Sequence, residues 1–449
     1  MEKYLGNKRI LLPAIFEFVN ANCPDAKSVF DVFAGTTNVG RFFRKKGFDV
    51  LSNDINRFSY VLGSTYLNLS KPLLFNGLPR SVRTHSAKMP ELQRAFQMSA
   101  KRDGDQLFPL SKTGEIWEEM YPAACVLSYL NSIQEKNKKT SAGLILKYYT
   151  VFGDRSDYES QRGTKGKRNY FSQENAKKLD LILECVRAWW KEKLLTPGET
   201  LFLLTSILEE VTLVANVNGT FHDFNREKLW PNSMQTLFLR MPLAFASNVK
   251  AQLFRDDALK ISKLVSPHDI LYIDPPYNFR QYTAYYHFLN FIAGYPFLPS
   301  VENYLSGIEF VRGQNMKDDF TSDFCFKDKF IPTLRQLIAN TPSKYVVMSY
   351  YGGRNHWNHW SKGVELHDEG YQRLSEVFFD QALFKKGSSK PVIELRQNYQ
   401  SRIGEQKKMV DEYLFFGAKY PSRAVKVSKV PTARSSAAIS RALGLNEIS

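Results

Sequence analysis

The sequence has few of the residues that build disulfide frameworks, metal centres or membrane anchors. Only four of its 449 residues are cysteine, and no two form a Cys-x-x-Cys pair, which argues against a disulfide scaffold and a cysteine zinc site. No uninterrupted apolar run reaches membrane-spanning length, and the first ten residues lack the apolar core of a signal peptide. We therefore expect reduced thiols in a cytoplasmic protein that has neither a membrane segment nor a metal.

Acidic residues are also in short supply. The chain has 61 Lys and Arg against 45 Asp and Glu, which gives a net charge of +16 and an isoelectric point near 9.4. Such an excess favours a polyanionic partner, although an ordinary basic protein is the alternative. With 43% hydrophobic residues over this length, the chain can bury a large core, and we expect two or three domains.

The most informative stretch follows a short apolar run. Residues 270–273 predict a strand that is buried on both faces, and the run stops at Asp274-Pro275-Pro276-Tyr277. Two consecutive prolines make a stiff, non-helical corner. A carboxylate, carbonyl groups and an aromatic ring then meet at the carboxyl end of a strand, where open α/β sheets bind ligands. A turn with an incidental acid is the alternative.

With Tyr272 and Asn278 flanking it and Tyr-Tyr-His-Phe-Leu at 285–289, this tetrad resembles the catalytic motif of D12 class adenine-N6 DNA methyltransferases. The resemblance implies a class I methyltransferase α/β fold. Its Rossmann-like, mostly parallel sheet carries helices on both faces, and a largely helical target-recognition domain is inserted. It also implies S-adenosylmethionine as methyl donor, the four residues from Asp274 to Tyr277 as catalytic, and Asp274 as a cofactor contact as well. Cytosine-N4 and RNA methyltransferases carry related tetrads.

The amino-terminal segment places an aromatic residue and two cations around a Gly-Asn turn. Lys8 and Arg9 there suit a carboxylate partner, with ordinary solvated charge as the alternative. An amphipathic run from Ile10 to Val19 predicts a helix directly afterwards. The segment resembles the amino-terminal cofactor motif of D12 enzymes, which implies that Tyr4 and Lys8 contact the cofactor.

A strand, a small-residue turn and a helix follow at residues 28–46. This layout lets backbone N–H groups approach a ligand, but the glycine spacing is no dinucleotide fingerprint, and tight packing explains it equally well. The turn resembles the Phe-x-Gly cofactor loop of the same methyltransferases, which implies cofactor contacts from Phe33 and Gly35. Thr36 and Thr37 stand where the family usually has another small residue or a glycine.

Two further acids follow predicted strands. Asp54 ends the run 48–54, about 20 residues beyond the Gly-rich turn, where a carboxylate suits ribose hydroxyls; a helix N-cap is the alternative. The resemblance assigns Asp54 to the cofactor's ribose. It assigns Asp257, after the predicted strand 250–254, to the cofactor's adenine, with Asp256 as the alternative register. Predicted strands at 344–350, 394–399 and 412–417 complete the pattern.

Residues 70–245 interrupt the strand–helix alternation. Helices are predicted over 175–193 and 201–217, and a glycine-containing loop over 154–171 carries clustered cations beside Tyr170 and Phe171. Flexible cations next to aromatics suit phosphate contact and base stacking, with a solvated loop as the alternative. The resemblance makes this insertion the target-recognition region. The candidate DNA-binding residues are Arg162, Lys165, Lys167 and Arg168.

We therefore expect a catalytic domain from residues 1–69 and 246–417, a DNA-binding insertion at 70–245, and a mobile basic tail at 418–449. The motif order is typical of α-group amino-methyltransferases. The predicted function is methylation of adenine N6 in a specific double-stranded DNA sequence. The enzyme would be prokaryotic or phage-encoded and would work either beside a cognate restriction endonuclease or as an orphan. Cytosine-N4 or RNA adenine methylation, or a non-catalytic DNA-binding relative, are the alternatives.

Overall fold

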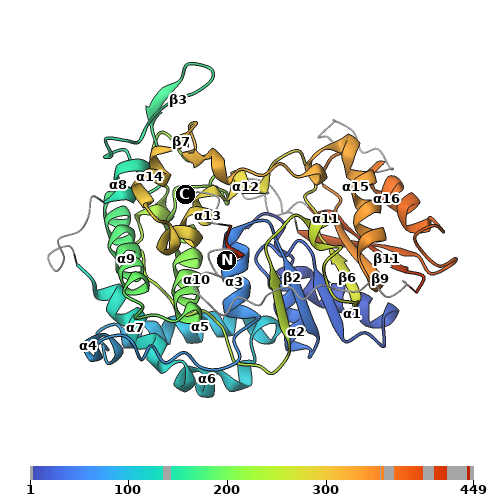
Figure 1. The fold of residues 1–449 in the computed structure, drawn as a ribbon, viewed down its shortest axis with the longest axis horizontal. Helices are drawn as coiled ribbons and strands as arrows, with labels where there is room; N and C mark the ends of the chain where they lie inside the picture. Colours follow the sequence, from blue (N-terminus) through green and yellow to red (C-terminus); the bar gives the residue numbers. More distant parts are fainter. Residues whose placement is uncertain are drawn as a thin grey trace.

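The computed structural model describes residues 4–134, 143–353, 355–357, 369–397, 409–421 and 442–444. Figure 1 shows two lobes, with a twisted sheet and its helices at the right and a helical lobe at the left. Helix α3 (Arg57–Tyr66) lies between them and packs into the core of the helical lobe through Phe58, Val61 and Leu62.

The sheet lobe is built on a seven-stranded, mostly parallel sheet. Strands β5, β2, β1, β6 and β9 run parallel to one another, whereas β11 lies antiparallel to both β9 and β10. This arrangement confirms the predicted class I methyltransferase α/β fold. In spatial order the strands are β10 (Lys390–Gln397), β11 (Met409–Ala418), β9 (Ser343–Tyr351), β6 (His268–Ile273), β1 (Ser28–Asp31), β2 (Asp49–Asn53) and β5 (Ala251–Phe254).

Both faces of the central strands are buried, as the apolar run in β6 predicted. Ile270 and Tyr272 face the core beneath α1 (Leu12–Asn22) and α2 (Asn38–Lys45). Leu271 and Ile273 alternate with them and face the core beneath the helices on the other side. Those helices are α11 (Ala258–Ile261), α15 (Lys327–Asn340) and α16 (Glu369–Phe379).

The order of the strands creates a switch point between β1 and β6. The chain leaves β1 towards β2 on one side and later returns to place β6 on the other side, in register at Val29–Ile270. The carboxyl ends of both strands therefore open onto one crevice, which is where α/β sheets bind ligands.

The helical lobe comes largely from the inserted residues, and none of the described residues in 70–245 adds a strand to the seven-stranded sheet. Helix α10 begins at a capping box between Thr196 and Glu199, which satisfies the free N–H groups of its first turn. Helices of the insertion are α4 (Arg80–Arg83), α5 (Met89–Leu107), α6 (Thr113–Glu119), α7 (Tyr121–Ser132), α8 (Leu144–Tyr149), α9 (Gln173–Lys191) and α10 (Pro197–Val214).

Helices from the segment after β6 complete the helical lobe. Helix α13 (His287–Gly294) is wholly buried and packs with α3 and α10 in one core. Tyr286 and Phe288 lie in this core, so part of the aromatic segment after the catalytic tetrad serves packing. The segment also forms α12 (Tyr282–Tyr285) and α14 (Val301–Ser306).

Two expectations differ from the structure. The basic stretch expected as a loop forms a two-stranded hairpin of β3 (Asp157–Glu159) and β4 (Lys165–Lys167), which protrudes from the helical lobe in Figure 1. Part of the tail that we expected to be mobile is packed: Leu443 is fully buried, and its carbonyl accepts a hydrogen bond from Arg57 Nε at 2.6 Å. Residues 398–408, which include the predicted turn before the last strand, lie outside the described residues.

Candidate active site

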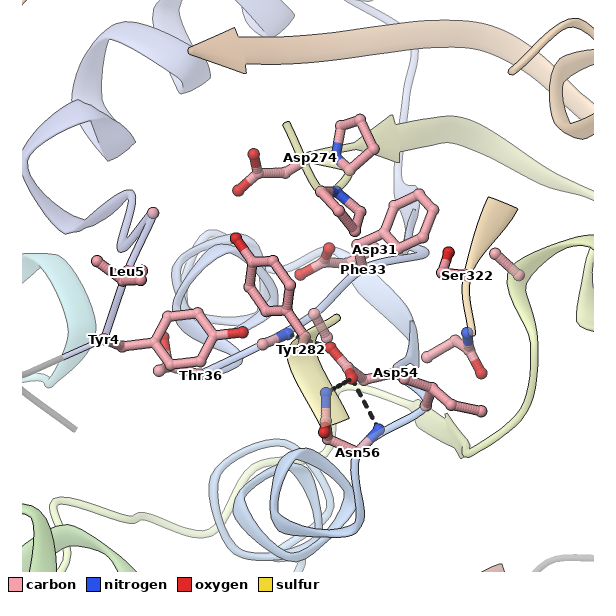
Figure 2. A pocket seen from close by; sticks show the side chains of 18 of the residues that line it. Tyr4, Leu5, Asp31, Phe33, Thr36, Asp54, Asn56, Asp274, Tyr282 and Ser322 are labelled. Carbon is pink, nitrogen blue, oxygen red and sulfur yellow. Dashed lines mark hydrogen bonds between the residues drawn. The ribbon is translucent and has the colours of Figure 1, made fainter. Parts of the chain in front are cut away.

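A pocket opens at the switch point of the sheet. It encloses about 940 Å³ of empty space, a volume that includes open solvent at its mouth. Figure 2 shows that the carboxylates of Asp31, Asp54 and Asp274 lie around Tyr282. These acids come from the ends of β1, β2 and β6, so the sheet itself brings them together.

The predicted catalytic tetrad forms one wall of this pocket. Asp274 follows directly after the last residue of β6, with Pro275, Pro276 and Tyr277 turning away from the strand. The Asp274 side chain keeps 18% of its surface exposed, so its carboxylate is held by the protein yet open to a ligand. The Tyr277 ring lies 5.0 Å from that of Tyr351 on β9.

Lys8 fixes the Asp274 carboxylate. Its ammonium lies 2.9 Å from Asp274 Oδ1 and 2.8 Å from Glu412 Oε1, and only 2% of the Lys8 side chain is exposed. Glu412, on β11, is fully buried and also accepts a hydrogen bond from Ser349 Oγ at 2.5 Å. One cation therefore joins the amino-terminal segment to the central strand and to the antiparallel strand. Sequence reasoning expected a carboxylate near Lys8 but missed Glu412.

Gly35 sits where a side chain has no room. Its φ is +49°, and a Cβ there would lie 2.9 Å from the hydroxyl oxygen of Tyr4, so both the backbone and the close approach require glycine. The Tyr4 ring stacks on Tyr286 at 4.6 Å between centroids. Thr37 also has a left-handed backbone, with φ of +62° and no exposed surface. Tyr4, from the amino-terminal segment, and the backbone at Gly35 therefore lie together in the lining of the pocket.

Asp54 orders the turn at Gly35 through hydrogen bonds to its carboxylate. Its Oδ2 accepts the Gly35 N–H at 2.8 Å and its Oδ1 accepts the Asn56 N–H at 2.9 Å. Asp54 is not the N-cap of α3, since Asn56 occupies that position. Burial raises the pKa of Asp54, and the N–H groups of Asn56 and Gly35 oppose this rise. The carboxylate therefore orders the loop and still lines the pocket.

The remaining predicted cofactor residues also line the pocket. Phe33 packs edge-on against Phe324, with 5.0 Å between the ring centroids. Asp257 is the N-cap of α11 and accepts the N–H groups of Leu259 and Lys260 at 3.0 and 3.1 Å. The alternative residue Asp256 lines the pocket too, so the geometry leaves both registers open.

Asp31 is a pocket residue that sequence reasoning missed. It is 1% exposed, and neither carboxylate oxygen has a hydrogen bond of ordinary geometry within the described residues. Burial, followed by the charges of Asp274 and Asp54, raises the pKa of Asp31 well above its usual value, and the N–H groups of Gly40 and Phe33 partly oppose this. The only available signal was a carboxylate inside the strand that precedes the Phe-x-Gly turn.

The four candidate DNA-binding residues are not equivalent. Arg162 and Lys165 are exposed in the β3–β4 hairpin, and Lys167 is partly exposed. Lys165 faces Glu159 across the hairpin at 3.4 Å. Arg168 is 4% exposed, and its guanidinium donates to the carbonyl oxygens of Phe310 and Val311 at 2.9 and 3.1 Å. The structure therefore places Arg168 as an internal support rather than as a surface cation.

Three further observations concern metal binding, His287 and membrane spans. The described residues contain no group of three or more His, Cys, Asp or Glu side chains arranged to hold a metal ion. His287, inside α13, shares a hydrogen bond at 2.9 Å with the Phe221 carbonyl. No helix in the described part of the chain is both long and apolar enough to cross a membrane.

Replacement of Lys8 by methionine should strongly destabilise the protein. The substitution leaves the carboxylates of Asp274 and Glu412 without their shared cation, and loss of one partner from a buried ion pair costs about 3–5 kcal/mol. The free energy of unfolding in urea measures this. The matched control is Lys329→Met, which breaks an exposed ion pair to Asp323 of the same 2.9 Å length and should cause no measurable change. Equal losses in both variants would contradict the assigned role of Lys8.

Comparisons with known proteins agree with this geometry. The family model for D12 class N6 adenine-specific DNA methyltransferases matches residues 4–297. The chain is similar to the modification methylase StsI of Streptococcus sanguinis, at 29% identity over 78% of this chain and 43% of that relative. The chain therefore spans less than half of the StsI enzyme.

Relatives of similar length are also found. The type II methyltransferase M.NlaIII of Neisseria lactamica is 28% identical over 77% of this chain and 82% of its own. M.CviAII of Paramecium bursaria Chlorella virus 1 is 23% identical over 92% of this chain and 97% of its own. Taken with the pocket at the end of β6, the match over residues 4–297 shows that this chain belongs to the D12 class of N6 adenine-specific DNA methyltransferases.

Proposed function

We propose that this protein transfers a methyl group from S-adenosylmethionine to the N6 amino group of adenine in a specific double-stranded DNA sequence. The observation that carries the proposal is the carboxylate of Asp274, held 2.9 Å from a buried ammonium at the open end of β6. The names of the relatives describe modification methylases. We therefore assign the protein to the modification step of a restriction–modification system, or to an orphan methyltransferase, that acts on cytoplasmic DNA.

The tetrad suits the chemistry of an exocyclic amine, whose lone pair is delocalised into the ring. Asp274 accepts one N6 hydrogen and the Pro275 carbonyl accepts the other, which draws the nitrogen towards tetrahedral geometry. Pro276 stiffens the corner, and Tyr277 stacks on the base. Positioning and fixed electrostatics supply most of the rate enhancement, so no covalent enzyme intermediate is needed. Because N6 is not freely accessible inside a duplex, the adenine must flip out.

The pocket fits S-adenosylmethionine. The bound cofactor supplies an electrophilic sulfonium methyl group. Its positive charges suit a cavity that is lined by the buried carboxylates of Asp31 and Asp54 and by the partly exposed carboxylate of Asp274. We assign Asp54 to the ribose and Asp257 to the adenine, with Asp256 as the other register. The remaining candidate contacts to the cofactor are Tyr4, Phe33 and the backbone at Gly35. Lys8 acts through its ion pair with Asp274.

We assign target recognition to residues 70–245 and catalysis to residues 1–69 and 246–417. Support comes from the seven-stranded sheet, whose strands lie in the second group apart from the last residue of β11, Ala418. The basic tail, 418–449, is a separate segment that meets the body at Leu443. The alternatives remain cytosine-N4 or RNA adenine methylation and a non-catalytic DNA-binding relative. Bound cofactor without methyl transfer to any nucleic acid would favour the last of these.

Methyl transfer should depend on the Asp274 carboxylate. Asp274→Ala removes the acceptor for the amino hydrogen and should lower the rate by at least about 10²–10³-fold. Transfer of a labelled methyl group from S-adenosylmethionine to DNA measures this. Tyr277→Phe is the milder control, since stacking needs the ring and not the hydroxyl, whereas Tyr277→Ala should be severe. Retained transfer by the Asp274→Ala enzyme would overturn the assignment.

Cofactor binding should strengthen as the pH rises above about 4, the ordinary pKa of an aspartate. Burial raises the pKa of Asp31 and so favours its protonated form in the free protein. A cationic ligand favours the carboxylate form instead. Cofactor binding therefore releases a proton from Asp31 as long as the pH lies below the raised pKa of the free protein. Asp54, Asp274 and Lys8 also line the pocket and are unchanged in the comparison variant. Calorimetry in buffers of different ionisation enthalpy counts the protons released. Asp31→Asn should release about one proton fewer, and an unchanged count would exclude Asp31.

The β3–β4 hairpin should bind DNA phosphates. Lys165→Ala should weaken binding to target and scrambled duplexes alike and lower the salt dependence by about one contact. Glu159→Gln releases Lys165 from its partner at 3.4 Å and should strengthen binding to both duplexes. If Arg162 reads a guanine, Arg162→Ala should instead relax discrimination at one base pair by about 1–3 kcal/mol. Unchanged affinity in all three variants would place the DNA surface elsewhere in the insertion.

A further inference from the structure

A strained turn in the helical lobe carries an exposed aromatic ring. Strands β7 (Ile308–Glu309) and β8 (Gln314–Asn315) are antiparallel and enclose the turn Phe310–Gly313. Phe310 has a φ of +60° and is 43% exposed. A left-handed backbone is unfavourable for a bulky residue, and such strain is found mainly at functional sites. Ile308 and Val311 pack against the helical core, so strain and exposure coincide at Phe310.

Four successive carbonyl groups of this turn are held by buried side chains of the insertion. Arg168 donates to the carbonyls of Phe310 and Val311, as described above. Tyr149 Oη donates to the Gly313 carbonyl at 2.9 Å, and Tyr170 Oη shares its single proton between the Arg312 carbonyl at 3.0 Å and the Phe221 carbonyl at 2.7 Å. These three side chains are at most 4% exposed. These hydrogen bonds hold the backbone of the turn, and the Phe310 ring remains partly exposed to solvent.

The same turn is connected to the wall of the active site. Arg312 Nε donates to Gln314 Oε1 at 2.6 Å, and Gln314 Nε2 donates to Asp319 Oδ1 at 3.1 Å. Asp319 Oδ1 also accepts the Thr283 hydroxyl at 3.1 Å, and Thr283 lines the pocket. Figure 1 shows β7 between the protruding hairpin that contains β3 and helix α12. The turn thus lies between the hairpin proposed to meet DNA and the pocket proposed to receive the base.

We propose that Phe310 is the wedge that enters the DNA duplex and fills the space left by the flipped adenine. This inference rests on the proposed function. A flipped base leaves a gap in the stack, and aromatic side chains stack on bases of any sequence. Arg312 lies over the Phe310 ring at 5.3 Å and brings a cation to the neighbouring backbone phosphate. Arg168, which sequence reasoning assigned to DNA, becomes the positioning residue of the wedge.

Phe279 is a second exposed ring and lies two residues after the tetrad. It is 66% exposed, and the Arg280 guanidinium lies 5.5 Å from its centroid. Its backbone has no positive φ, and the following Arg280 carbonyl is held by a weak bond from Cys325 Sγ at 3.4 Å. A wedge must keep its position while it separates stacked bases, so the rigid turn favours Phe310.

The experiment compares methyl transfer on two duplexes that contain the target sequence, as identified first from DNA modified by the wild-type enzyme. In one duplex the target adenine faces thymine; in the other it faces an abasic site, which lowers the cost of flipping. Phe310→Ala should transfer about tenfold more slowly to the paired duplex and at close to the wild-type rate to the abasic one. Phe379→Ala, which removes a ring that is 58% exposed on α16, should match the wild type on both.

Two further variants at position 310 test whether the effect comes from the ring or from a loss of stability. Phe310→Trp should retain wild-type rates on both duplexes, because the ring is kept. Phe310→Gly should unfold at a higher temperature than the wild type, since glycine accepts the left-handed backbone without strain, yet it should show the same selective loss on the paired duplex. Stability gained together with transfer lost separates a wedge from a merely structural ring.

The outcomes against the proposal are distinct. If Phe310→Ala transfers as fast as Phe379→Ala on each duplex, the ring has no role in flipping. If Phe310→Ala loses the same factor on both duplexes, the ring does not act as a wedge. Either result would overturn the wedge while the proposed function stands. A selective loss in Phe279→Ala alone would also overturn it and move the role to that ring. A wild-type enzyme that transfers no methyl group to any DNA would overturn the proposed function and the wedge together.

Discussion

The active site depends on one buried ammonium group. Lys8 lies between Asp274 on the central strand and Glu412 on the antiparallel strand, at 2.9 and 2.8 Å. A charge removed from water is costly unless it is paired, so three segments that are distant in sequence must meet at this point. The ion pairs set the position of the carboxylate that we propose accepts a hydrogen of the substrate amine.

The two lobes contribute different parts of the site. The sheet supplies the carboxylates at its switch point, whose positions follow from strand order alone. The helical insertion supplies Tyr149, Arg168 and Tyr170, which hold the turn at Phe310. The turn itself belongs to the chain segment that follows β6. The insertion, to which we assign recognition, is therefore joined to the segment that follows the catalytic tetrad by hydrogen bonds within the helical lobe.

The fold and the core of the pocket could be predicted from the sequence because their signals are local. An apolar run that ends at two prolines defines β6 and places Asp274, and a glycine after a strand defines the turn that Asp54 holds. Glu412 and Asp31 could not be found in this way. Each looks like an ordinary strand residue, and its role comes from neighbours that are far away in the sequence.

Burial was equally hard to predict from composition. Arg168 stands in a basic stretch and resembles its solvated neighbours, yet only the folded insertion shows that it is an internal support. The hairpin around it has short strands with exposed charges and no apolar alternation, so a loop was the natural prediction. The strain at Phe310 likewise arises from tertiary hydrogen bonds and has no sequence signature.

The most direct measurement is the chemical identity of the modified base. The full chain is expressed in a bacterial host without DNA methylation of its own, and the host DNA is sequenced for base modification and hydrolysed for mass spectrometry. The account predicts N6-methyladenine at one short recurring sequence. N4-methylcytosine as the modified base, or DNA without any added methyl group alongside a folded, cofactor-binding protein, would contradict it.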